Sequence, residues 1–294
     1  MSSGLRPLAL QESSSGDSKR AAHVVGIDES GNSADGAFVL AAVQCPRSSG
    51  ERLAELLIEL DLDPWVSKSS SAPSTLTDSG LTDTVIELIR QIRDEPITWH
   101  AAACWGNCPV DKQAMTACII STKSLTRHRD SQGGYEGNAA LLHDGKGDNF
   151  GNGYIKLRRA GRTQFEGFGD RETPVFISML ESGDRIYPEI TAADYIAGLI
   201  RSEIHNEGSI EAVDIPMIDR ISNSWSTPKD ASPEPQYEIR ARNHQREPKR
   251  QDRAAAWIEG RRPPTTDAWG DRPLEAIVDR LSSDVVRNYL LTEL

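Results

Sequence analysis

The chain has 294 residues and a net charge of −11, with 44 acidic and 33 basic residues. A chain of this length can bury roughly 75% of its unfolded surface, enough for one large domain or two small ones. No apolar run approaches the roughly 20 residues of a membrane-spanning helix, so we expect no association with a membrane. An acidic chain is not expected to bind nucleic acid over its whole surface, although its charge is compatible with a local basic groove.

The beginning of the chain and its charged residues indicate a cytoplasmic protein. Residues 1–20 lack the long apolar stretch of a signal peptide, and we expect them to form a disordered leader. Of the 33 basic residues, 25 are arginine. Few lysines and many surface acids are compatible with a halophilic cytoplasm, where salt screens the self-repulsion of the surface. An ordinary acidic protein is the alternative explanation.

The hydrophobic pattern alternates between strand-like and helix-like segments. In chain order, we expect strands at 23–27, 36–44, 97–104, 139–143 and 174–180. Between and after them we expect helices at 50–60, at 81–93, from 111 onward, at 191–204, at 253–260 and at 274–291. We expect Ser30-Gly31-Asn32 to form a turn after the first strand, and the first two strands to pair as a hairpin. This order predicts an α/β fold with a mixed sheet flanked by helices.

The composition divides the chain into two parts. Residues 21–224 contain the alternating strands and helices and are expected to form the α/β domain. From 223 to about 248 the chain is rich in Pro, Arg, Gln and Glu and loses its periodicity, as in a linker. We therefore interpret residues 225–294 as a linker and a helical C-terminal extension.

Two adjacent acids, Asp28 and Glu29, come directly after the apolar strand at 23–27. A carboxylate at the end of a buried strand is costly to desolvate unless another group compensates it. Asp144 ends a later strand in the same way, and Asp194 is expected in the first turn of the helix at 191–204. Functional sites of α/β sheets gather at strand ends and nearby helix termini, so we expect these four acids to share one pocket.

Such a pocket would need cations. At 4 Å and an effective dielectric constant of about 20, each pair of like charges costs on the order of 4 kcal/mol. Carboxylate oxygens without soft ligands favour Mg²⁺ or Mn²⁺. Two such ions about 4 Å apart can activate a water and stabilise the leaving oxygen of a phosphodiester. We therefore expect the four acids to be catalytic metal ligands, namely Asp28, Glu29, Asp144 and Asp194.

Each acid also has a simpler explanation. Asp28 can cap the expected turn at residues 30–31 through a side-chain hydrogen bond. Asp144 precedes Gly145, a common turn pair, and Asp194 follows Thr191 by three residues, as in a capping box. The metal hypothesis therefore depends on the set of acids and not on any one of them.

Two motifs carry a resemblance to known proteins. The sequence GIDESGN at 26–32, followed by AFVLAAV, and ADYIAG at 193–198 resemble a domain-of-unknown-function family. That family has an N-terminal Asp-Glu-Ser-Gly signature and a ribonuclease H-like fold. The same features, over residues 23–206, distantly resemble type 2 ribonuclease H. That enzyme has an Asp-Glu pair in its first strand, an Asp ending a later strand and an Asp near a late helix.

The resemblance implies a nuclease site. Asp28 would bridge two metal ions, and the other three acids would complete the set, with Asp148 or Glu181 as substitutes for Asp144. Type 2 ribonuclease H reads the ribose with a Gly-Arg-Gly turn, whereas this chain has Ser30-Gly31-Asn32 at that place. The substrate therefore stays open among DNA, RNA and their hybrid.

Basic residues after the fourth expected strand are candidates for binding the nucleic-acid backbone, because cationic contacts give sequence-independent affinity. They are Lys156, Arg158, Arg159 and Arg162. The segment Ser30-Gly31-Asn32 is expected to contact nucleic acid as well. A second basic cluster, in the tail at 240–253, is interrupted by acids. A solvated surface of mixed charge is the alternative for both clusters.

Other functions fit the sequence less well. GIDESGNS lacks the Lys of a phosphate-binding loop, since Asn32 stands in its place. His100, Cys104 and Cys108 are spaced by four, but a zinc site needs a fourth ligand and tighter cysteine spacing. The main alternative is a non-catalytic nucleic-acid-binding or adaptor protein of the same fold, whose C-terminal helix binds a protein partner.

Overall fold

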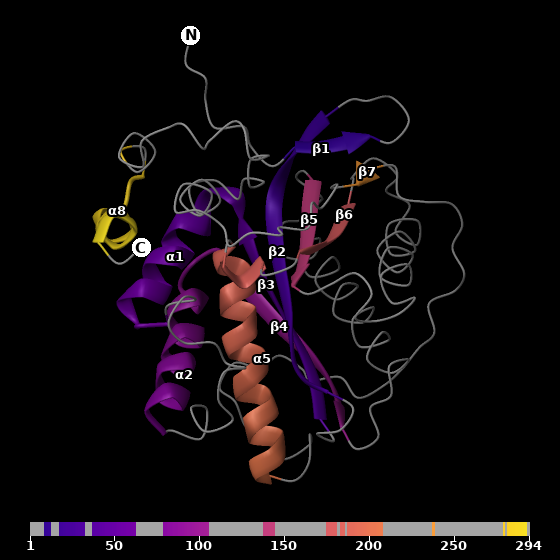
Figure 1. The fold of residues 1–294 in the computed structure, drawn as a ribbon, viewed down its shortest axis with the longest axis vertical. Helices are drawn as coiled ribbons and strands as arrows, with labels where there is room; N and C mark the ends of the chain where they lie inside the picture. The colour runs from indigo at the N-terminus through magenta and orange to yellow at the C-terminus, as the bar shows by residue number, and fades with distance from the viewer. Residues whose placement is uncertain are drawn as a thin grey trace, which may run out of the picture.

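The computed structural model describes residues 9–12, 18–32, 37–62, 79–105, 138–144, 175–180, 183–185, 187–207, 237–238, 279 and 281–292. These residues form an α/β structure in which a mixed sheet packs against helices (Figure 1). The predicted fold class is confirmed at this level.

The sheet is built around one long strand, β2 (Ser18–Asn32). On one side, β3 (Ala37–Pro46) pairs antiparallel with β2, and β4 (Thr98–Trp105) pairs antiparallel with β3. On the other side, β5 (Asn138–Asp144) runs parallel to β2, and β6 (Val175–Leu180) runs parallel to β5. The order across the sheet is therefore β4-β3-β2-β5-β6. The sequence predicted all five of these strands.

The first predicted strand is longer than expected at both ends. The ladder with β3 continues from His23 to Asn32, so the expected turn at Ser30-Gly31-Asn32 is wrong. Those residues remain in the strand because they pair with β3. Within this ladder, Gly31 has a backbone φ of +93°. At the other end, β1 (Ala9–Glu12) pairs antiparallel with the start of β2 and with β7 (Tyr237–Glu238). The structure thus places strands inside the segment 1–20, where we expected a leader.

Three helices cover one face of the sheet: α1 (Gly50–Glu59), which follows the short helix η1 (Arg47–Ser49), α2 (Ser79–Arg93) and α5 (Pro188–Glu207) (Figure 1). Buried apolar side chains of these helices pack on β3 and β4. The main contributors are Leu53, Leu56, Leu57, Val85, Leu88, Ile92, Ile196, Leu199 and Ile200 against Val39, Ala41, Val43, Ala101 and Ala103. Within the described residues, no helix is long and apolar enough to cross a membrane.

The third of these helices begins earlier than predicted. It starts at Pro188, a residue suited to the first helical position because its missing N–H would be unpaired there anyway. The hydroxyl of Thr191 donates to the backbone oxygens of Asp184 at 2.5 Å and Tyr187 at 3.2 Å. The expectation of a cap at Thr191, with Asp194 in the first turn, is therefore wrong. Asp194 lies in the second turn of α5.

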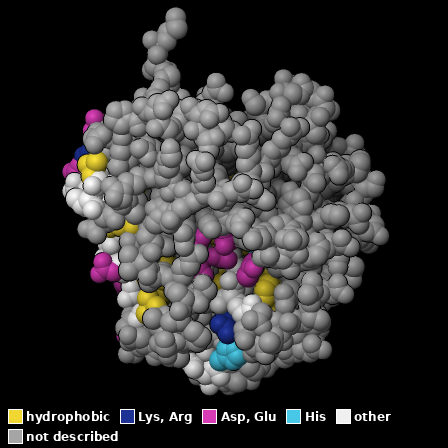
Figure 2. Space-filling model, in the orientation of Figure 1, with side chains coloured by type: hydrophobic (Ala, Val, Ile, Leu, Met, Phe, Trp, Pro, Cys, Tyr) yellow, Lys and Arg dark blue, Asp and Glu magenta, His cyan; other side chains and the backbone are white. Residues whose placement is uncertain are grey.

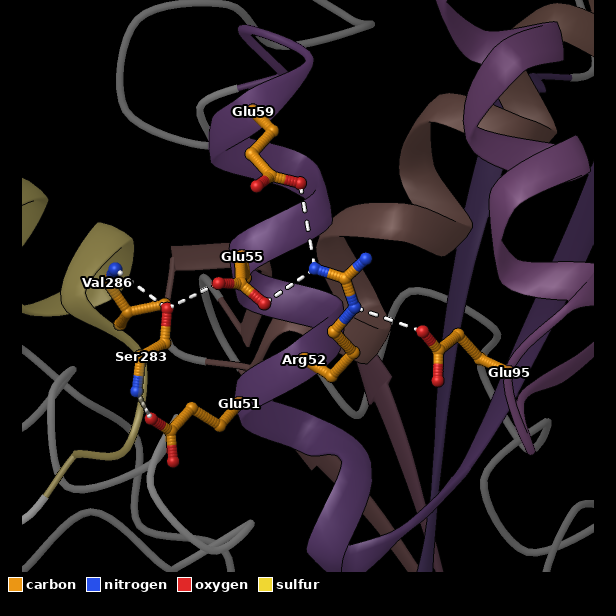
Figure 3. A network of polar contacts seen from close by, with 7 residues as sticks. All are labelled: Glu51, Arg52, Glu55, Glu59, Glu95, Ser283 and Val286. Carbon is orange, nitrogen blue, oxygen red and sulfur yellow. Dashed lines mark hydrogen bonds and ion pairs between the residues drawn. The ribbon is translucent and has the colours of Figure 1, made fainter.

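The C-terminal helix α8 (Asp284–Thr292) docks on α1 through polar groups (Figure 3). Ser283 caps α8, because its hydroxyl accepts from the backbone N–H of Val286 at 3.3 Å. It also contacts α1, since its N–H donates to Glu51 at 2.5 Å and its hydroxyl donates to Glu55 at 2.8 Å. On the other side of α1, Arg52 binds Glu55, Glu59 and Glu95.

The prediction of one helix over 274–291 is wrong in its first part, since residues 281–283 are not helical and the Ser283 cap starts the helix. The predicted helices from 111 and at 253–260 lie outside the described residues. Of the predicted linker, the structure describes only β7.

Candidate functional site

Asp28 and Asp144 lie side by side on neighbouring parallel strands. The ladder pairs Gly26 of β2 with Leu142 of β5, and Ile27 with His143. The next residue on each strand is therefore an aspartate. Because paired residues of adjacent strands point to the same face and strands are about 4.8 Å apart, both carboxylates lie on the face of the sheet that α5 covers. The strand register thus brings together two predicted site residues that are far apart in the sequence.

The start of α5 lies directly on β2 at Gly26. A Cβ atom at this position would lie 2.2 Å from the backbone carbon of Glu189 and 2.3 Å from the backbone nitrogen of Ile190. Only glycine permits this approach, since real Cβ atoms do not come so close to backbone. Gly26 therefore sets where the helix begins relative to the strand.

A second contact sets the direction of α5. A Cβ atom at Gly31 would lie 3.0 Å from Cδ and Nε of Arg201. From Gly26 to Gly31, β2 advances about 16 Å, and from Ile190 to Arg201, α5 also advances about 16 Å. The helix therefore runs alongside the strand in the same direction. Interpolation between the two contacts places Asp194 opposite Asp28.

A further acid, Asp184, joins this group from the short helix η3 (Gly183–Arg185). The backbone N–H of Gly183 donates to Oδ1 of Asp144 at 2.5 Å, and the Asp184 carbonyl accepts from the hydroxyl of Thr191 at 2.5 Å. These bonds tie η3 between the end of β5 and the start of α5. Sequence reasoning missed Asp184, although the criterion used for Asp144, an acid shortly after a strand, applies to it.

The neighbouring acids act on the buried carboxyl of Asp28. Asp28 is only 6% exposed, and its Oδ1 accepts from the N–H of Glu29 at 2.7 Å. Burial raises the pKa of Asp28 well above its usual range, and the carboxylates of Asp144, Asp194, Glu29 and Asp184 raise it further, in that order. All four predicted acids therefore belong to one electrostatic cluster, which we call the acid cluster: Asp28, Glu29, Asp144, Asp184 and Asp194.

Glu29 approaches the cluster from the other face of the sheet. Successive side chains of a strand alternate in direction, so Glu29 shares its face with His143 and not with Asp28. Oε2 of Glu29 lies 3.8 Å from Nδ1 of His143, and that nitrogen donates to the Asp144 backbone oxygen at 2.7 Å. Burial lowers the pKa of His143 to about 4, so the imidazole is neutral at pH 7 and its contact with Glu29 is not an ion pair.

Acidic side chains gather near the centre of the face shown in Figure 2, with a basic side chain and a histidine below them. In the part of the chain that the structure describes, no three His, Cys, Asp or Glu side chains are already arranged around a single metal position. The alternative ligands Asp148 and Glu181 lie outside the described residues, and so do the predicted basic residues Lys156, Arg158, Arg159 and Arg162.

Comparison of the sequence with protein-family models and with curated proteins finds no match. Any proposal about function therefore depends on the acid cluster, on the fold that assembles it and on the resemblance of the two motifs.

Proposed function

We propose that the chain is a metal-dependent nuclease with a ribonuclease H-like fold that hydrolyses phosphodiester bonds of DNA, RNA or their hybrid. The observation that carries this proposal is the buried Asp28 carboxyl surrounded by four other carboxylates. The arrangement of the acids supports it as well. Asp28 and Glu29 lie in the central strand, Asp144 ends the parallel strand next to it, and Asp194 lies on a late helix. This is the pattern of acids that the resemblance to type 2 ribonuclease H implies.

The chemistry of the cluster fits Mg²⁺ or Mn²⁺. Its members offer only carboxylate oxygens, which are the ligands that these hard cations prefer. Burial, and then the charges of the other carboxylates, raise the pKa of Asp28, and bound cations would relieve the repulsion among these charges. We assign Asp28, Asp144 and Asp194 as the residues that would hold the metal, with Asp184 as an additional candidate; the predicted ligand Glu29 lies on the opposite face of the sheet and is left out of this set. When bound, such ions activate a water and stabilise the leaving oxygen of a phosphodiester.

The protein's own contribution is the position of these groups. The ladder between β2 and β5 holds Asp28 beside Asp144, and the close contact at Gly26 holds α5, with Asp194, over the strand. The hydrogen bonds of η3 hold Asp144 and Asp184 together. The neutral His143 fills the opposite face below Glu29. Metal ions held by these carboxylates would orient a phosphate group in line with a water.

Calorimetric titration with Mn²⁺ and Mg²⁺ tests the metal site. Wild type should bind the ions saturably, and Asp28→Asn should lose this binding. Asp83→Asn, which removes an exposed carboxylate of α2, is the control and should bind like wild type. Equal and weak binding by all three proteins would reject the proposal.

Hydrolysis then separates the nuclease from a non-catalytic binder. Wild type should cleave at least one of a labelled single-stranded DNA, a single-stranded RNA and an RNA–DNA hybrid when Mn²⁺ is present, and Asp28→Asn should not. Metal binding without cleavage of any of the three would favour the nucleic-acid-binding or adaptor protein instead.

A further inference from the structure

The side chain of Arg201 follows the acid cluster along α5. Arg201 is seven residues after Asp194, so it lies on the same side of the helix and about 10 Å further along its axis. It is partly exposed, whereas Asp194 is buried. A cation therefore lies about two helical turns beyond Asp194, on the helix that contributes this acid to the cluster.

Gly31 makes room for this side chain. A Cβ atom there would lie 3.0 Å from both Cδ and Nε of Arg201, and 2.2 Å from the backbone oxygen of Ala37. The residue also has a φ of +93°, which glycine adopts at no steric cost. The end of β2 is thus shaped to hold the arginine along the strand that carries Asp28 and Glu29. The sequence had pointed to this end of the strand, residues 30–32, as a contact for nucleic acid.

We propose that Arg201 binds a backbone phosphate of the substrate outside the bond that lies at the acid cluster. This inference rests on the proposed nuclease function. A guanidinium group can form two parallel hydrogen bonds with a phosphate. A polyanion that approaches five carboxylates needs such a cationic contact outside the metal positions.

The salt dependence of binding tests this contact. The probes are a fluorescein-labelled single strand of about 20 nucleotides in DNA and the same strand in RNA. Anisotropy is measured from about 50 to 200 mM salt with Ca²⁺ present. For a single strand, each phosphate contact contributes about 0.7 to the slope of log affinity against log salt concentration. Arg201→Ala should weaken binding about tenfold and reduce the slope by about one contact. Arg201→Lys should retain the slope, and Arg90→Ala, which removes an exposed arginine of α2, should change neither quantity.

A purely structural arginine would behave differently. Arg201→Ala would then lower the free energy of unfolding but leave the salt slope of the folded protein at the wild-type value, and this result would overturn the inference. Failure of the wild type to bind either strand would overturn it too.

Hydrolysis of bis(p-nitrophenyl) phosphate with Mn²⁺ separates this inference from the nuclease proposal. We expect this small phosphodiester, unlike a long strand, not to span from the acid cluster to Arg201. Arg201→Ala should hydrolyse it at the wild-type rate and should lose about tenfold in kcat/KM on the long strand alone. Equal losses on both substrates would overturn the inference and leave the nuclease proposal standing. Strand binding that depends on Arg201 without hydrolysis of any substrate would support the inference and reject the nuclease.

Discussion

The backbone nitrogen of Ile190 lies 2.3 Å from the position that a Cβ atom on residue 26 would take, so α5 and β2 meet where Gly26 has no side chain. Gly26→Ala must push the helix away from the strand. Because the clash is with backbone and not with a flexible side chain, we expect a loss of about 2 kcal/mol or more in the free energy of unfolding. Urea denaturation measures this loss.

The same change should also weaken Mn²⁺ binding in the protein that remains folded, since it moves Asp194 relative to Asp28. A free energy of unfolding and a metal affinity both equal to those of wild type would contradict the close contact. Ser30→Ala, two residues beyond Asp28, provides a small-residue comparison without such a clash.

Glu189 gives the stability a dependence on pH. Its side chain is buried, and burial raises its pKa to about 7 although its own backbone amide acts to lower it. Neither of its carboxylate oxygens has a hydrogen-bond partner of standard geometry within the described structure. The pKa of Glu189 in the folded protein lies above the unfolded value of 4.5. The contribution of Glu189 to the free energy of unfolding is therefore fully present below pH 4.5 and is lost as the pH rises through 7. The loss amounts to about 3 kcal/mol.

His143 opposes this dependence, because burial lowers its pKa from 6.5 to about 4. The stability that His143 contributes is present above pH 6.5 and is lost as the pH falls through 4. Between about pH 4.5 and 6.5 the two contributions offset each other in wild type. Glu189→Gln removes the glutamate contribution, so the histidine contribution is no longer offset by it. Relative to wild type, the free energy of unfolding should therefore fall toward acid pH by about 3 kcal/mol.

Chemical denaturation at a series of pH values measures how the free energy of unfolding depends on pH in wild type and in Glu189→Gln. Asp83→Asn, an exposed carboxylate change, is the control and should follow the wild-type curve. Parallel curves for wild type and Glu189→Gln would show that the pKa of Glu189 is the same in the folded and unfolded protein, contrary to the expectation.

Asp28→Asn should stabilise the metal-free protein at pH 7. The raised pKa means that the ionised carboxylate is less favourable in the folded than in the unfolded chain, first because of burial and then because of its acidic neighbours. The Tm of this variant should exceed that of wild type in EDTA. Added Mn²⁺ should raise the Tm of wild type and leave the Tm of the variant unchanged. At a free Mn²⁺ concentration of one hundred times Kd, the free energy of unfolding of wild type should rise by about 2.7 kcal/mol. A lower Tm for the variant in EDTA would mean that the carboxylate has a stabilising partner.

Ser283→Ala should loosen α8 without affecting the acid cluster. The change removes the cap on the Val286 N–H and the hydrogen bond to Glu55, at a cost of about 1 kcal/mol. Hydrogen exchange should increase in α8 and stay unchanged in α5. Ser282→Ala, a change at the exposed neighbouring residue, is the matched control. Equal exchange in both variants would show that the apolar contacts of α8, through Val286 and Leu290, suffice to dock it.

Much of the fold follows from the sequence, because a strand or a helix repeats its apolar pattern locally. The helical spacing of Leu53, Leu56 and Leu57 predicts α1, and the apolar run from Ala139 to His143 predicts β5. The acid pair at the end of an apolar run also predicted that the buried carboxylate of Asp28 needs another group to compensate its desolvation. Local rules also produced the errors. The turn expected at Ser30-Gly31-Asn32 is overridden by pairing with β3, and the cap expected at Thr191 is overridden by the earlier helix start at Pro188.

By itself, the sequence determined which charged residues stand at the ends of buried segments, because an apolar run and the acid that follows it are both local features of the chain. Only the tertiary structure decided which of these charges meet. The parallel ladder brings Asp144 beside Asp28, and the missing side chain of Gly26 lets α5 place Asp194 above them. The same packing adds Asp184, which η3 ties to Asp144 and Thr191. Strand register and helix contact act between residues more than a hundred positions apart, and no local pattern encodes that distance.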